Sequence, residues 1–291
     1  MVVKKTIRSA VILTLACLHA YLLYAQSPDS TSVNKSKNRS GKNVFTSGLF
    51  MAKGQFEVKM FNNLYTEVVP YNDNFNKRSS FFTSFLQLTI GSNRNINYGL
   101  DLLYKSNVMD DLAGNSPFKV LYFDKKSEAN MQQGEQITTI FNHGLSHIGG
   151  RIRVKPFKEK RFTFQQAVYI PAGNIDGGWV INSNLFFEYL NARKKFMLFG
   201  DLGVWYNTRQ LPFPYLKVFG GTLIAKRLGP YIMFNLPYEI GSGLKIFVLP
   251  KMELEFLYTW WLPLEWTVQD RRPQTFNIGL RFANFRNFER R

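Results

Sequence analysis

The sequence predicts an all-β protein: a transmembrane, antiparallel, up-and-down β-barrel of about twelve strands, preceded by a signal peptide. Three observations carry this prediction. Successive segments alternate large apolar residues with polar ones at a period of two, which gives each segment two unlike faces. The charged residues of these segments share the polar face, and short turns alternate with mostly longer loops. The 291 residues suffice for one large β domain.

The N-terminus has the layout of a secretory signal peptide, which we expect at residues 1–25. Three cations precede an apolar run of 16 residues, and the small residue Ala25 offers a cleavage point. That run is short for a membrane-spanning helix, which needs about 20 apolar residues. Cleavage would also remove Cys17, the only cysteine, so disulfides and cysteine-based sites are excluded from the mature chain. Lipidation at Cys17 is the minor alternative.

Charge limits the partners of the exported chain. The net charge is +17, or +14 without residues 1–25, which carry three cations and no acid. Residues 26–44 are rich in Ser, Asn and Lys and are expected to form a disordered periplasmic arm. An exported protein rarely meets nucleic acid, so none is expected as a partner. Outer-membrane lipid and lipopolysaccharide are the partners that this charge favours.

The barrel itself is expected at 45–282, followed by a basic tail at 283–291. Strands are placed where the two-residue alternation runs between turn signals such as Gly, Asn and Pro. The expected strands are, in order, 55–64, 81–90, 96–105, 145–155, 162–170, 179–189, 196–206, 216–225, 231–236, 240–248, 252–261 and 275–282. The ninth is short and ends at Pro237, so ten strands is an open alternative, as is fourteen.

The hairpin at 145–170 is the clearest example of the pattern. In its first strand Ile148 and Ile152 fall on one face, while Arg151 and Arg153 fall on the other. Across all the expected strands, charged side chains lie opposite the large apolar ones. A Lys or Arg that faced lipid at mid-membrane would cost about 2–4 kcal/mol, so the charged face is expected to line a wet lumen.

Nine charged residues are the candidates for lining that lumen. They are Lys59, Asp101, Arg151, Arg153, Lys155, Lys217, Lys245, Glu253 and Glu255. Cations and acids on this face nearly balance, which gives no clear selectivity. A structural network of salt bridges is at least as good an interpretation of these residues as contact with a solute.

A soluble two-sheet sandwich would show the same alternation, so other features must decide. Aromatic residues stand at strand ends, such as Tyr65, Tyr104, Trp179 and Trp260, where a barrel has its aromatic girdles. Connections also alternate in length. Short turns are expected at 91–95, 156–161, 191–195, 226–229 and 249–251, and longer loops at 68–80, 106–144, 171–178, 207–214 and 262–274. Both features favour the barrel, with its two termini in the periplasm.

Few residues of the mature chain could carry chemistry. His143 lies three residues before Ser146, slightly like the His-x-Ser element of outer-membrane phospholipase A, but at this spacing the two point to opposite faces of a strand. Ser146 and His147 are split in the same way. We expect no catalytic, metal or cofactor site. The long loop 106–144 contains an apolar stretch, 118–123, which either folds into the barrel mouth as a constriction or forms an external cap.

Several segments resemble the putative outer-membrane transporters of Bacteroidetes, which are related to the meta-pathway phenol-degradation barrel family. The similar elements are the Lys-Pro-Phe-Lys run at 155–158, the Ile-Pro pair at 170–171, the Phe-Phe-x-Tyr run at 186–189 and the first strand at 53–65. The resemblance implies a barrel in the outer membrane and supplies no catalytic residues.

The expected function is a passive channel or transporter for small solutes, hydrophobic ones included. A barrel without transport activity that displays its loops is the first alternative. A lipid hydrolase that uses Ser146 is the second.

Overall fold

The structure is a computed structural model that describes residues 50–51, 53–72, 75–92, 95–121, 128–132, 135–155, 162–173, 178–190, 196–224, 227–236, 239–249, 251–262 and 273–284. The signal peptide predicted at 1–25 and the arm predicted at 26–44 lie outside these residues. So do residues 285–291 of the predicted tail. Among the described residues, no helix is long and apolar enough to cross a membrane.

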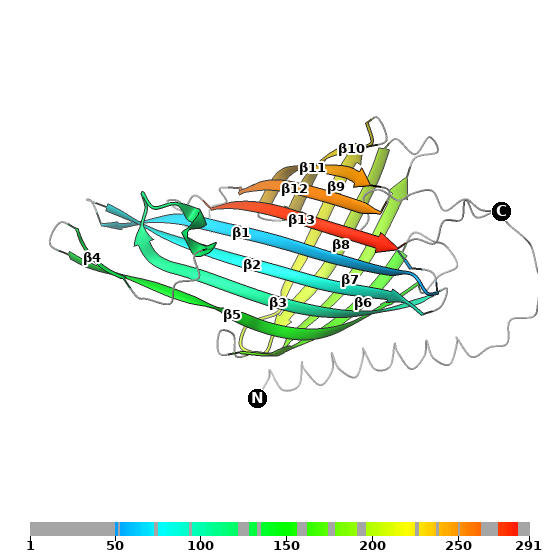
Figure 1. The fold of residues 1–291 in the computed structure, drawn as a ribbon, viewed down its shortest axis with the longest axis horizontal. Coiled ribbons are helices and arrows are strands. Elements are labelled where there is room, and N and C mark those ends of the chain that lie inside the picture. The colour runs from blue at the N-terminus through cyan, green and yellow to red at the C-terminus, as the bar shows by residue number, and fades with distance from the viewer. Residues whose placement is uncertain are drawn as a thin grey trace, which may run out of the picture. The chain divides into compact units, whose positions relative to one another are not determined.

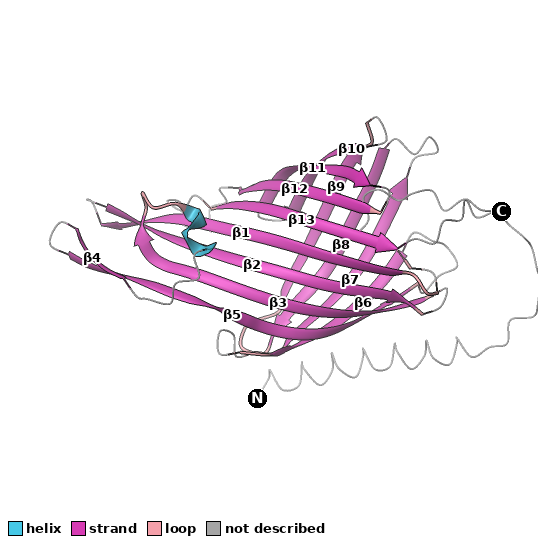
Figure 2. Ribbon diagram, in the orientation of Figure 1, coloured by secondary structure: helices cyan, strands magenta, loops and turns pink. Residues whose placement is uncertain are grey.

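The described chain is almost entirely β-structure (Figures 1 and 2). Its elements are β1 (Phe56–Asn72), β2 (Phe75–Gly91), β3 (Ile96–Leu112), the 3-10 helix η1 (Pro117–Leu121), β4 (Glu128–Gln132), β5 (Glu135–Val154), β6 (Phe162–Pro171), β7 (Val180–Leu190), β8 (Phe196–Asn207), β9 (Phe213–Thr222), β10 (Leu228–Leu236), β11 (Glu239–Leu249), β12 (Met252–Trp261) and β13 (Gln274–Asn284).

These strands form a closed antiparallel barrel. Each strand from β5 to β13 pairs with the next, β13 pairs with β1, and β1–β2–β3 follow. The pairing of β3 with β5, from Ile96↔Val154 to Met109↔Ile140, closes the ring. Strand β4 pairs only with the start of β5, so twelve of the described strands make the barrel wall. The predicted fold class and strand count are confirmed.

The distribution of side chains is that of a membrane barrel. Outward-facing Leu100, Leu202 and Ile278 are 53%, 51% and 52% exposed, whereas the inward-facing Asp101 is completely buried. A water-soluble protein would bury the former and expose the latter. Apolar outside and polar inside is the pattern of outer-membrane β-barrels, and it excludes the two-sheet sandwich.

The two ends of the barrel differ. We call one end the short-turn end. There, consecutive strands are joined by short connections such as 91–96 and 249–252. The first wall strand begins at this end, at Phe56, and the last one ends here, at Asn284. At the other, the long-strand end, β1, β2, β3 and β5 project beyond their neighbours (Figure 1). The first three have 17 residues each and β5 has 20. About 9–11 residues span a membrane, so these strands continue outside it.

Two predicted loops are therefore wrong in extent. Residues 68–80 are mostly strand, since β1 runs to Asn72 and β2 begins at Phe75. The loop 106–144 contains the end of β3, η1, β4 and the start of β5. Beyond the membrane neither face of a strand needs to be apolar, so the alternation that revealed the other strands fades here. Strand β9 also begins earlier than predicted, at Phe213 rather than residue 216.

Helix η1 packs on the outer face of the barrel. Val120 is fully buried against Leu64 and Val108, with Phe82 and Phe276 packed around them. Leu64 shares its strand face with Met60, which is 40% exposed to the outside. The Ser106 hydroxyl donates a hydrogen bond to the Val120 carbonyl (2.8 Å) and holds the helix there. The part of the apolar stretch that the structure describes, 118–121, therefore does not constrict the lumen.

Candidate functional site

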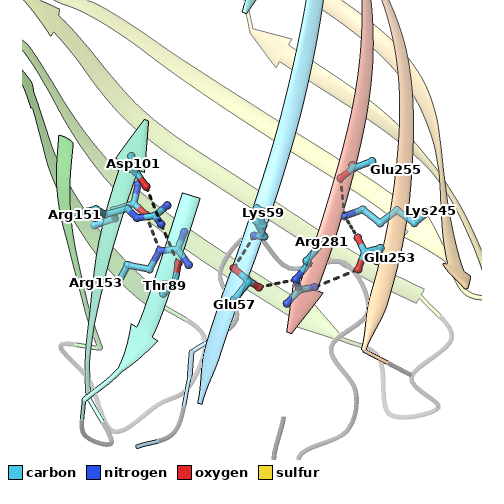
Figure 3. A network of polar contacts seen from close by, with 11 residues as sticks. Glu57, Lys59, Thr89, Asp101, Arg151, Arg153, Lys245, Glu253, Glu255 and Arg281 are labelled. Atoms are coloured by element: carbon cyan, nitrogen blue, oxygen red, sulfur yellow. Dashed lines mark hydrogen bonds and ion pairs between the residues drawn. The ribbon is translucent and has the colours of Figure 1, made fainter. Parts of the chain in front are cut away.

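A layer of ion pairs crosses the interior near the short-turn end (Figure 3). Arg281 on β13 lies between two acids, with its Nε 2.6 Å from Glu57 Oε2 and its Nη1 3.2 Å from Glu253 Oε2. Lys245 on β11 continues the row, 3.0 Å from Glu253 and 3.2 Å from Glu255. These residues are neighbours because the register pairs Arg281 with Glu253 and Lys245 with Glu255. The row thus alternates in charge across four strands, and Lys59 extends it, 3.2 Å from Glu57.

A second cluster lies on β3 and β5. Arg151 Nη2 is 3.2 Å from Asp101 Oδ1 and donates a hydrogen bond to the Thr89 hydroxyl (2.9 Å). The guanidinium reaches across Gly99, where an added Cβ would lie 2.7 Å from Arg151 Nε, so only glycine admits this path. The Tyr169 hydroxyl donates to the other oxygen of Asp101 at 3.1 Å. This carboxylate is thereby held from two sides.

The structure brings most of the predicted lining residues together in these two clusters. Lys59, Lys245, Glu253 and Glu255 belong to the first, and Asp101 and Arg151 to the second. Arg153 is buried, donates to the Gln165 side chain (2.6 Å) and stands over the Phe186 ring. Two others are half-buried against aromatic rings: Lys155 lies 4.7 Å from the centre of the Phe50 ring, and Lys217 lies 5.1 Å from that of Tyr215. The contacts that the structure shows for the nine predicted lining residues are thus contacts with other groups of the protein.

An interior cavity of about 400 Å³ lies on the long-strand side of these clusters. Side chains of five barrel strands and of the connection after β8 line it. They are Thr83, Phe85, Leu103, Lys105, His147, Val180, Trp205, Asn207 and Gln210. This volume falls in the range of pockets for small organic ligands, roughly 300–1,000 Å³. Lys105 is the one charged side chain among these lining residues.

The rings of Phe85 and Trp205 line the cavity and form what we call its aromatic floor, and both pack on Tyr169, which does not itself line the cavity. Tyr169, which is 2% exposed, packs edge-on against Phe85 with ring centres 5.9 Å apart and stacks on Trp205 at 6.1 Å. Because the Tyr169 hydroxyl is bonded to Asp101, the floor is tied to the second ion-pair cluster. A group that entered the cavity from the long-strand end would meet these rings before it met the buried charges.

Ser146 and His147 are closer than the sequence predicted. The pairing of β3 with β5 shifts register between Leu103 and Tyr104, and the resulting bulge at Ser146 turns both side chains inward. Ser146 Oγ lies 2.5 Å from His147 Nδ1, and His147 Nε2 lies 2.9 Å from the Gly178 carbonyl oxygen. A carbonyl only accepts, so Nε2–H donates to it, and Nδ1 accepts from the serine hydroxyl.

The prediction that Ser146 and His147 point apart was therefore wrong. Nevertheless the serine hydroxyl is not presented to the cavity, because Ser146 is completely buried and does not line it. Among the residues that the structure describes, no carboxylate bonds His147, whose second nitrogen donates to a backbone carbonyl. In the part of the chain that the structure describes, no group of three or more His, Cys, Asp or Glu residues could hold a metal ion.

Sequence reasoning missed the apolar residues of the cavity. Phe85, Leu103, Val180 and Trp205 all lie on the strand face that carries the charged and polar residues. An aromatic or large aliphatic residue on that face has no lipid to contact. Its presence there was the sequence signal that could have indicated an apolar part of the barrel interior. Which of them meet across the barrel depends on strand register, which the pattern within one strand does not give.

No protein-family model matches the chain, and no curated protein matches it in sequence. Among solved structures, an outer-membrane channel from Pseudomonas putida F1 is similar with a TM-score of 0.49 and 10% identity, over 81% of this chain and 96% of that one. The toluene transporter TbuX from Ralstonia pickettii is similar with a TM-score of 0.42 and 8% identity, over 80% and 90%.

The β domain of the Bordetella autotransporter BrkA has a TM-score of 0.44 and 12% identity, over 77% of this chain and 98% of that domain. Similarity at this level, shared by channels and an autotransporter domain alike, carries no inference about function. What the chain does must be argued from its own residues.

Proposed function

We propose that the protein is a passive outer-membrane channel for small solutes, hydrophobic ones included. The observation that carries the proposal is the interior cavity of about 400 Å³, which is lined by Phe85, Leu103 and Trp205 on the side nearer the ion-pair clusters. A barrel that served only as an anchor would have no need of such a space. Barrels of this size lie between filled eight-stranded barrels and open sixteen-stranded porins.

The proposed path runs from the long-strand end through the cavity toward the ion-pair clusters. The aromatic floor and the row from Glu57 to Glu255 stand in that path, so passage requires side chains there to rearrange. In the row, Arg281 and Lys245 share Glu253, and each cation has a second acid beside it. A cation that leaves one acid therefore still has another, which lowers the cost of rearrangement relative to breaking an isolated buried pair.

The partners and the family relationship belong to the same proposal. Outer-membrane lipid would surround the apolar outer face, and lipopolysaccharide would contact the strands that project beyond the membrane. The Lys-Pro-Phe-Lys, Ile-Pro and Phe-Phe-x-Tyr elements at 155–158, 170–171 and 186–189 support descent from the Bacteroidetes transporters related to the phenol-degradation family.

Solute uptake by proteoliposomes tests the proposal. Purified protein in vesicles should admit a small aromatic alcohol, such as 3-phenyl-1-propanol, faster than empty vesicles do. Since this solute also crosses lipid, the comparison needs short times and a glucose control that does not cross unaided. Uptake equal to that of empty vesicles for every solute, with no conductance in planar bilayers, would leave the barrel as an anchor or loop display.

A further inference from the structure

The inner wall formed by β7 to β10 carries a continuous row of aromatic side chains. Phe186, Phe199, Phe219 and Tyr231 come from these four strands, one from each. Their successive ring centres lie 5.7, 5.7 and 6.0 Å apart, which is the spacing of rings in contact. Phe199, Phe219 and Tyr231 each lie three residues from the short-turn end of their strands. We call these four residues the ring row.

The ring row points into the lumen and fills it locally. On the opposite faces of β8 and β10, Leu202 and Ile232 are 51% and 52% exposed toward lipid, whereas Phe199 and Tyr231 are only 3% and 5% exposed. A side chain on the wall of a water-filled lumen would keep much of its surface exposed. Packed side chains rather than water therefore occupy the lumen beside these rings.

Both ends of the ring row join the charged residues of the barrel interior. At one end the Tyr231 hydroxyl donates a hydrogen bond to Glu255 (2.5 Å), and Lys245 lies 5.9 Å from the centre of the Tyr231 ring. At the other end the Arg153 guanidinium lies 5.9 Å from the centre of the Phe186 ring. The ring row thus continues the ion-pair row around the inner wall, and the two form one layer near the short-turn end.

The ring row is distinct from the cavity. On β7, Phe186 lies six residues beyond Val180 in the direction of the short-turn end, and on β8, Phe199 lies six residues before Trp205. Six residues of a strand span about 20 Å. A solute that moves from the cavity toward the short-turn end therefore reaches the ring row only after it has passed the aromatic floor.

Of the two parts of this layer, the ring row is the one that an apolar solute displaces at lower cost. A phenylalanine ring is held by dispersion and by ring–ring contacts, and an apolar body that enters between the rings replaces those contacts with its own. A buried carboxylate that loses its cation is left uncompensated, so the ion-pair row resists displacement. Ions and sugars offer the rings no replacement contacts, so the closed ring row excludes them.

We propose that the ring row is the selective barrier of the channel: it excludes ions and small hydrophilic solutes, and it yields to an apolar solute. Phe199 and Phe219 are its central residues, because each contacts two other rings of the row. This assignment rests on the proposed channel function and adds the residues that decide what passes.

Removing the two central rings tests this role. In vesicles the unaltered protein should admit 3-phenyl-1-propanol and exclude glucose, and in planar bilayers it should show no ion conductance. Phe199→Ala/Phe219→Ala abolishes all three ring contacts, and their combined loss corresponds to an open fraction about tenfold larger or more. This variant should therefore take up glucose and conduct ions.

A control variant removes comparable side chains from the outer face. Ile232→Ala/Phe234→Ala shortens two residues of β10 that are 52% and 39% exposed toward lipid, and it should still exclude glucose. Heat-modifiable gel migration shows whether each protein forms the barrel. If the double variant of the ring row does not, Phe219→Ala alone removes two of the three contacts from a half-buried position and is measured instead.

The outcomes separate the barrier from the channel. Glucose uptake or steady conductance in the unaltered protein would overturn the barrier, and so would a ring-row variant that stays closed to glucose or a control that admits it equally. In each of these cases uptake of the alcohol by the unaltered protein leaves the channel proposal standing. If the alcohol enters only through the ring-row variant, the rings are a permanent plug and both proposals fail. If it enters through none of the proteins, both fail as well.

Discussion

The ion-pair row is the feature whose energetic role can be predicted most directly. Replacing Arg281 with Met keeps much of the side-chain volume and removes the cation that two acids share. In the folded barrel Glu57 is 1% exposed and Glu253 is 5% exposed, so neither carboxylate can turn to bulk water. Breaking a buried pair by removing one partner costs about 3–5 kcal/mol, mostly because the other charge is left uncompensated. Here Glu57 keeps Lys59 and Glu253 keeps Lys245, so Arg281→Met should lower the free energy of unfolding by less, about 1.5–3 kcal/mol, the cost of the lost charged hydrogen bonds.

Unfolding in urea, from detergent micelles or vesicles and followed by tryptophan fluorescence, gives the measurement. Lys251→Met is the matched control, because that lysine lies at an exposed turn, and it should change the free energy by less than about 0.5 kcal/mol. The double variant Glu57→Gln/Arg281→Met should recover part of the loss, since one of the two acids that lost Arg281 has become neutral. A loss in Arg281→Met no larger than in the control would refute the reasoning and would mean that water reaches the row.

Three further variants probe other parts of the barrel by the same unfolding measurement. Val120→Ala should lower stability by about 1.5–3 kcal/mol, because it removes buried methyl groups where η1 docks on the outer wall; no change would mean that the helix is not held there. Ile278→Lys should cost about 2–4 kcal/mol in vesicles, because this 52% exposed position faces lipid, and a neutral result would contradict the outward assignment of its face. Tyr169→Phe should cost about 1.5–3 kcal/mol, because Asp101 loses a donor, and an unchanged midpoint would show that the 3.1 Å hydrogen bond contributes nothing.

Within the membrane the sequence was sufficient to predict the wall. Twelve strands and the inward face of charges such as Asp101 and Arg153 follow from one local rule, because lipid on one side and a polar interior on the other impose strict alternation. Outside the membrane, strict alternation is no longer imposed. Most of residues 68–80 and the start of β5 form strands that extend beyond the length needed to span a membrane, and their weaker alternation made them look like loops.

The candidate site depends on relations between strands, and these are not written in any one segment. Ser146 is an extra residue in β5 opposite β3, and this bulge lets the Ser146 and His147 side chains face the same side of the strand. Strict alternation cannot anticipate such an insertion. The docking of Val120 on Leu64 is likewise a contact between distant parts of the chain. The same pattern that predicted the wall therefore gave no information about what the wall encloses or carries.

The interior charges and the cavity have different physical roles, and the register explains how one barrel holds both. Near the short-turn end, opposite charges face each other on adjacent strands, as Arg281 and Glu253 do, so each is neutralised by its neighbour. Toward the long-strand end the pairing partner of Lys105 is Thr83, which carries no charge. The barrel thus combines a layer of mutually neutralised charges near the short-turn end with a cavity whose lining side chains are mostly uncharged.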